Sequence, residues 1–141
     1  MIFRLLLLVM LLFAIGCSDL INESELESKR GLLYNPKTSK PYSGKVYRLY
    51  STGSKMREGV FDLGAIDGSY TYYDNEGSII VPVEENRLDL KDGKKYFPGT
   101  DREYWGLAYG LYQTGETSYE VFYEGGKLSS EYTYFKLDGS V

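Results

Sequence analysis

The chain has 141 residues and a formal net charge of −4 at neutral pH, with no histidine and a single cysteine, Cys17. The length allows one domain, and an acidic composition without a basic stripe argues against a nucleic-acid partner. The lack of histidine excludes the usual catalytic triads and histidine metal sites, so we expect no metal and no cofactor. Fifteen tyrosines and 16 glycines favour β-structure with many turns.

The N-terminus has the features of a signal peptide over residues 1–16. A single basic residue, Arg4, precedes an unbroken apolar run over residues 5–15. As a helix this run would rise about 16 Å, roughly half of the ~30 Å apolar core of a bilayer. The segment is therefore too short for a membrane span and has the length of a signal-peptide core.

The run ends at Ala14-Ile15-Gly16-Cys17, which resembles the lipobox of bacterial lipoprotein precursors. The resemblance implies cleavage before Cys17, a diacylglycerol on its sulfur and an acyl chain on its freed amine. Three chains on one residue would give stable attachment to membrane lipid, since one chain alone binds only marginally. Ser18 follows the cysteine, which by its resemblance to lipoprotein sorting rules indicates the outer membrane of the cell envelope. An ordinary cleaved leader is the alternative.

Residues 17–30 are polar and contain no aromatic side chain. We interpret this stretch as the lipidated cysteine followed by a tether, which would hold a folded domain at residues 31–141 away from the membrane.

The domain contains an internal repeat. Residues 42–79 align without a gap with residues 104–141 at an offset of 62, and 14 of the 38 paired positions are identical. A regular offset of this kind indicates one structural unit used twice. We interpret the stretch between the units, 80–103, as irregular.

Alternation of side chains inside the units predicts short strands. Tyr47 and Leu49 fall on one face of a strand and Val46, Arg48 and Tyr50 on the other. We therefore expect an all-β fold, an antiparallel β-meander of short hairpins, with no helix longer than two turns in either unit. The predicted turns lie at Gly53, Gly77, Gly93, Gly115 and Gly125-Gly126.

The pattern Gly44-x-x-Tyr47-x-x-Tyr50-x-x-Gly53 and its counterpart in 106–115 resemble MORN-type repeats. They are more closely similar to the variant found in bacterial proteins labelled YwqK-type antitoxins, where a segment like 35–46 precedes the first repeat. The resemblance implies an elongated antiparallel β-meander with one hairpin per repeat, and it does not imply an enzyme.

Candidate catalytic residues are scarce. Glu84 and Glu85 are adjacent, so in a strand they would point to opposite faces, and we interpret them as part of a charged loop. The sequence Asp74-Asn75-Glu76-Gly77 lacks the alternating ligands of a calcium loop and reads as a turn. We therefore expect no catalytic residue.

The candidate binding residues are tyrosines that recur in register. Rows of them would either pack in a core or form a docking surface, since tyrosine is enriched at binding hot spots. The six are Tyr47, Tyr70, Tyr72, Tyr109, Tyr132 and Tyr134.

The sequence thus predicts a bacterial lipoprotein, anchored to membrane lipid through Cys17, with a non-enzymatic repeat domain that binds a protein or another envelope component. One alternative is an antitoxin or immunity protein against a toxin that acts in the envelope. The other is a carboxylate-based envelope hydrolase.

Overall fold

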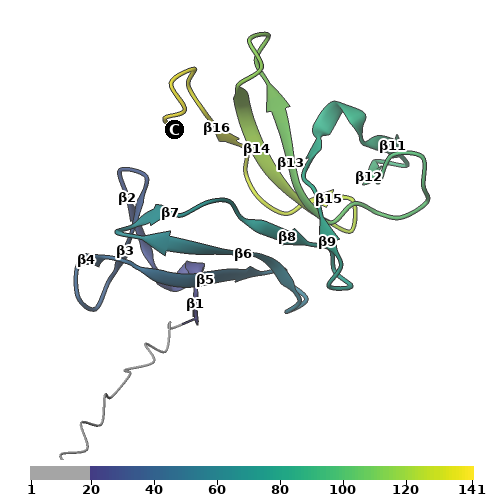
Figure 1. Cartoon of the computed structure of the whole chain (residues 1–141). Coiled ribbons are helices and arrows are strands. Elements are labelled where there is room, and N and C mark those ends of the chain that lie inside the picture. Colours follow the sequence, from purple (N-terminus) through teal and green to yellow (C-terminus); the bar gives the residue numbers. More distant parts are fainter. Residues whose placement is uncertain (1–19) are drawn as a thin grey trace, which may run out of the picture.

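The computed structural model describes residues 20–141 (Figure 1). The predicted signal peptide, Cys17 and Ser18 lie outside the described residues. The fold class is confirmed: the described chain is all-β, and its helical turns are the short 3₁₀ segments η1 (Glu23–Glu25) and η2 (Glu85–Arg87). Within residues 20–141, no helix is long and apolar enough to cross a membrane.

The first unit, residues 20–80, is built on one curved sheet and one small hairpin sheet. The main sheet has the order β1-β5-β6-β8-β9, with β7 pairing β6. Its strands are β1 (Leu20–Asn22), β5 (Gly44–Leu49), β6 (Lys55–Asp62), β7 (Ala65–Ile66), β8 (Thr71–Tyr73) and β9 (Ile79–Ile80). The small sheet contains β2 (Glu27–Lys29), β3 (Leu32–Asn35) and β4 (Lys40–Pro41).

The second unit, residues 82–141, repeats this architecture. Its main sheet has the order β10-β13-β14-β15, with β16 pairing β14, and a separate hairpin joins β11 to β12. The strands are β10 (Val83–Glu84), β11 (Asp89–Lys91), β12 (Lys94–Tyr96), β13 (Gly106–Leu111), β14 (Thr117–Glu124), β15 (Lys127–Leu128) and β16 (Thr133–Tyr134).

The 62-residue offset extends to the start of the described chain, which the sequence interpretation missed. The Tyr42 hydroxyl donates to the Lys45 carbonyl at 3.0 Å, and the equivalent Tyr104 hydroxyl donates to Leu107 at 2.5 Å. Upstream of these residues, β1, η1 and β2 correspond in the same way to β10, η2 and β11. Residues 82–103 are therefore the beginning of the second unit and not an irregular linker. Residues 20–30 likewise differ from the expected tether, because they form the same elements in the first unit.

Two strand pairs depart from the predicted antiparallel meander. β1 pairs with β5 in parallel, and β10 pairs with β13 in parallel. A parallel pair needs a crossover connection, and in each unit the 3₁₀ turn and the hairpin after it provide one. The long pairs β5–β6 and β13–β14 are antiparallel, as predicted.

The predicted glycine turns are confirmed, with positive φ at each position. Gly126 shows a second constraint: an added Cβ would lie 2.6 Å from the Lys95 carbonyl oxygen, so the close approach of the hairpin β11–β12 also requires glycine there.

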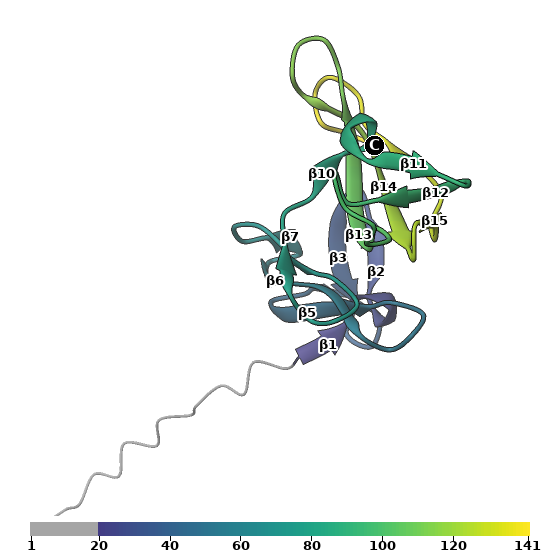
Figure 2. The ribbon, with the colours of Figure 1, turned by 90° about the vertical axis from the view of Figure 1, so that its right-hand side faces the viewer.

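The apolar core is divided into three clusters. One lies in each unit, around Val46 in the first and around Tyr104 in the second. The third joins the units, so the two sheets stack on each other, with the second unit above the first in Figures 1 and 2. The buried residues of this joining cluster are Tyr50, Met56, Leu107 and Phe122.

An aromatic contact and an ion pair lie at the edge of the joining cluster. The ring of Tyr50 meets Trp105 edge to face, with centroids 5.1 Å apart. The buried Asp74 carboxylate accepts a hydrogen bond from Arg102 at 2.9 Å. The ring contact and the ion pair together fix the second unit in one orientation on the first.

Candidate functional site

The six candidate tyrosines do not share one sheet face. Tyr70 and Tyr72 form one row, with ring centroids 5.9 Å apart, and Tyr132 and Tyr134 form the equivalent row at 6.0 Å. Tyr47 pairs with Glu58, whereas Tyr72 pairs with Arg57, the next residue along β6. Directly paired residues share a face and successive residues alternate, so Tyr47 lies on the face opposite Tyr72. Tyr109 occupies the equivalent position in the second unit.

The tyrosine rows are largely scaffold. Tyr70 packs against the core of the first unit, and Tyr72 packs against the cluster that joins the units. Tyr132 donates to the Glu85 carboxylate at 3.0 Å. Tyr134 is the exception in the rows, because 64% of its surface is exposed.

Glu85 is an anchor of the second unit, a residue that the sequence interpretation assigned to a charged loop. Its carboxylate accepts hydrogen bonds from the hydroxyls of Tyr119 at 2.8 Å, Tyr132 at 3.0 Å and Tyr123. Burial acts to raise the pKa of Glu85, but the hydrogen bonds from Tyr123, Tyr119 and Tyr132 outweigh it and the pKa is lowered. The carboxylate therefore stays charged and ties η2 to β14 and to the start of β16.

Glu23 is the equivalent anchor of the first unit. It accepts a two-pronged ion pair from Arg57, with Nη2 at 2.7 Å and Nε at 3.1 Å. The guanidinium also lies over the rings of Tyr70 and Phe122, at 4.1 and 5.2 Å. Burial acts to lower the pKa of Arg57, but the Glu23 charge outweighs it and raises the pKa. The signal that could have found both anchors is that Glu23 and Glu85 are 62 residues apart.

A difference between the units defines the candidate site. We call the sheet face that carries Lys45, Tyr47, Glu58, Val60 and Thr71 the outer face of the first unit. The equivalent face of the second unit has Leu107 for Lys45 and Phe122 for Val60. The first unit covers this face of the second unit, so Leu107 is only 2% exposed and Phe122 only 7% exposed.

In the first unit the same face is open. Val60 is 43% exposed, and the Lys45 side chain is exposed as well. A surface that is buried in one copy of a repeat and uncovered in the other is a natural place for a partner, because the fold already tolerates a contact there.

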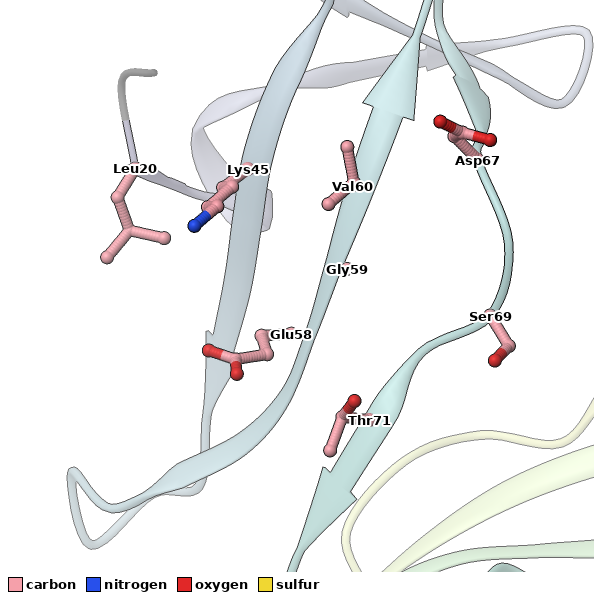
Figure 3. Close-up of a pocket in the computed structure, with 8 residues that line it drawn as sticks. All are labelled: Leu20, Lys45, Glu58, Gly59, Val60, Asp67, Ser69 and Thr71. Carbon is pink, nitrogen blue, oxygen red and sulfur yellow. The ribbon is translucent and has the colours of Figure 1, made fainter. Parts of the chain in front are cut away.

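The outer face is hollowed by a cavity of about 290 Å³ (Figure 3). β6 pairs with β7 at one end and with β8 at the other, and the chain over 67–70 bows away between these pairs. Gly59 forms part of the floor of the cavity where the chain bows out. The lining residues are Leu20, Lys45, Glu58, Gly59, Val60, Asp67, Ser69 and Thr71.

Glu58 gives the outer face a fixed negative charge. Its carboxylate accepts hydrogen bonds from Lys55 at 2.6 Å and from the Tyr73 hydroxyl at 2.5 Å, and these two bonds lower its pKa. At the equivalent position of the second unit, burial raises the pKa of Glu120. In the second unit, Thr117 stands at the position of Lys55 and Phe135 at the position of Tyr73.

No family model, curated protein or solved structure matches this chain. The resemblance to MORN-type repeats therefore stays a prediction from the sequence.

Proposed function

We propose that this chain is a bacterial lipoprotein, anchored in the outer membrane through Cys17, whose non-enzymatic repeat domain binds a protein partner at the outer face of the first unit. The anchor is supported by the apolar run and the residues Ala14-Ile15-Gly16-Cys17. An immunity protein against an envelope toxin would be one form of such a binding protein.

The observation that carries the binding proposal is the difference between the two units at equivalent faces. Leu107 and Phe122 are buried in the second unit, whereas the first unit presents Lys45 and Val60 to solvent. Tyr47 lies beside them on the same face. Tyrosine supplies contact area at protein interfaces, and surrounding charges select the partner.

The chemistry of the cavity favours binding over hydrolysis. A carboxylate hydrolase needs a general acid whose pKa is raised, next to a second carboxylate that stays ionised. The pKa of Glu58 is lowered by Lys55 and Tyr73, so this residue is suited to hold a charge and not to donate a proton. A partner's basic or hydroxyl group would find an acceptor at Glu58 and at Asp67, which lines the same cavity.

The first expected result concerns the anchor. Mass spectrometry of the mature protein is expected to find Cys17 as the first residue, with acyl groups on it. Cys17→Ala is expected to leave the precursor uncleaved at this site and without acyl groups. An unmodified Cys17 thiol on a membrane-bound chain would contradict the anchor.

The second expected result concerns the binding face. A photoreactive amino acid at Val60 is expected to crosslink a discrete protein in intact cells, because this position lies in the outer face. The same group at Asp92, exposed in the turn between β11 and β12, is the matched control and is expected to give no such adduct. Equal adducts at both positions, or none at Val60 in the folded protein, would contradict the proposed face.

A further inference from the structure

The second unit has an uncovered surface of its own. In the first unit, the residues that contact the second unit include Tyr50, Ser51, Met56, Arg57, Tyr72 and Asp74. Their equivalents at an offset of 62 form what we call the end surface of the second unit: Tyr112, Gln113, Ser118, Tyr119, Tyr134 and Lys136.

The end surface is more exposed than its counterpart in the first unit. Tyr50 is 2% exposed, whereas Tyr112 is 38% exposed. Both hydroxyls make the same internal bond, Tyr50 to the Tyr73 carbonyl and Tyr112 to the Phe135 carbonyl, each at 2.6 Å. The local structure is therefore the same in the two units, and the exposure of Tyr112 comes from the missing cover.

The cover on the first unit shows which groups fit this kind of surface. Trp105 and Phe122 supply rings over Tyr50 and Arg57. At the rim, Glu124 accepts hydrogen bonds from the backbone and hydroxyl of Ser51. The contact thus combines an apolar centre with charge-assisted hydrogen bonds at its edge, as in other specific interfaces.

Gln113 takes the place of Ser51 on the end surface and keeps a side-chain donor for a carboxylate. Lys136 takes the place of Asp74 and reverses its charge. The group that faces Lys136 should therefore be acidic, where the cover of the first unit has Arg102.

A second copy of this chain does not fit that description. Its outer face would present Lys45 for Leu107, Val60 for Phe122 and Ser43 for Trp105. Lys40 would stand in the place of Arg102 and meet Lys136, a like-charge pair. Replacement of the apolar centre and repulsion at the rim both disfavour stacking of identical copies.

We propose that the end surface of the second unit binds the sheet face of a different chain built from the same type of repeat. That face carries bulky apolar side chains at the positions of Leu107 and Phe122 and a carboxylate opposite Lys136. The end surface is separate from the outer face of the first unit. Binding at the end surface therefore goes beyond the proposed function, and its absence would leave the proposed function intact.

The test uses a probe made from this chain. The probe carries Ser43→Trp, Lys45→Leu and Val60→Phe, which reproduce the apolar centre, and Lys40→Glu, which supplies the acidic group. It also carries Lys136→Glu, so that probe molecules repel one another. Binding of the folded probe to the immobilised full-length parent in detergent is measured by biolayer interferometry.

The parent is expected to bind the probe and not to bind further parent chains. Lys136→Glu in the parent should weaken probe binding about threefold or more, and a probe that keeps both Lys40 and Lys136 should recover binding to that variant. Tyr134→Ser in the parent should weaken binding about fivefold or more. The proposal is overturned if parent copies bind one another as tightly as the probe, if the probe does not bind, or if neither parent substitution changes its affinity.

Discussion

Replacing Tyr104 with alanine is expected to destabilise the protein by about 3–5 kcal/mol, the usual cost of removing a fully buried aromatic side chain. Tyr104 is 0% exposed. Its ring meets Phe97 and Tyr123 edge to face, with centroids 4.7 and 6.1 Å away. The alanine variant would leave a cavity at the centre of the second unit, and chemical denaturation followed by circular dichroism measures the loss.

Two controls separate the ring from its hydroxyl and from the surface. Tyr104→Phe removes only the hydroxyl, which donates to the Leu107 carbonyl, and is expected to cost about 1–1.5 kcal/mol. Tyr134→Ala, at an exposed position, is expected to change stability by about 0.5 kcal/mol or less. If Tyr104→Ala were no more destabilising than Tyr134→Ala, the core of the second unit would not be packed as described.

Arg57→Ala is the second large effect, with an expected loss of about 3–5 kcal/mol. The side chains of Arg57 and Glu23 are only 10% and 17% exposed. Removing the guanidinium would leave the Glu23 carboxylate shielded from water without its cation, and it would also remove the contacts over Tyr70 and Phe122. The free energy of unfolding from urea titration is the measurement.

The repeat itself offers a rescue variant. The second unit has Tyr119 at the position of Arg57, and its hydroxyl donates to Glu85 at 2.8 Å. Arg57→Tyr is therefore expected to cost less than Arg57→Ala. Glu23→Gln combined with Arg57→Ala should cost less than the sum of the two single changes, because the residues are partners. Strict additivity would show that the ion pair contributes nothing to folding.

Local patterns in the sequence were sufficient for the fold class and the turns. Alternation over 45–50 and glycines such as Gly53 and Gly115 depend on neighbouring residues, so both signals are visible in the sequence without knowledge of the tertiary structure. The offset of 62 also appeared directly because tyrosines and glycines repeat over 42–79 and 104–141.

The first third of each unit was harder to recognise. Seven of the 22 positions in 20–41 and 82–103 are identical, but they are scattered, and residues 20–30 are mostly polar. The anchors Glu23 and Glu85 look like surface charges in a sequence. Their partners are far away in the chain, as in the bonds from Arg57 and Tyr119, 34 residues on.

The candidate site could not be predicted from strand alternation, because its openness depends on how the units dock. Alternation puts Leu107 and Tyr109 on the same face of their strand but does not indicate what covers that face. The first unit buries Leu107 in the joining cluster, whereas Lys45 at the equivalent position stays in solvent. Only the arrangement of the two sheets distinguishes a closed face from an open one (Figure 1).

Thiol labelling at two equivalent positions tests most directly whether one face is open and the other closed. Lys45→Cys and Leu107→Cys are made separately in a Cys17→Ser background, so that each chain carries one thiol. In the folded protein, the thiol at position 45 is expected to react as fast as in denaturant, and the thiol at position 107 only as fast as the protein unfolds. Fast labelling of both thiols in the folded protein would contradict the docking of the units and remove the basis for the proposed binding face.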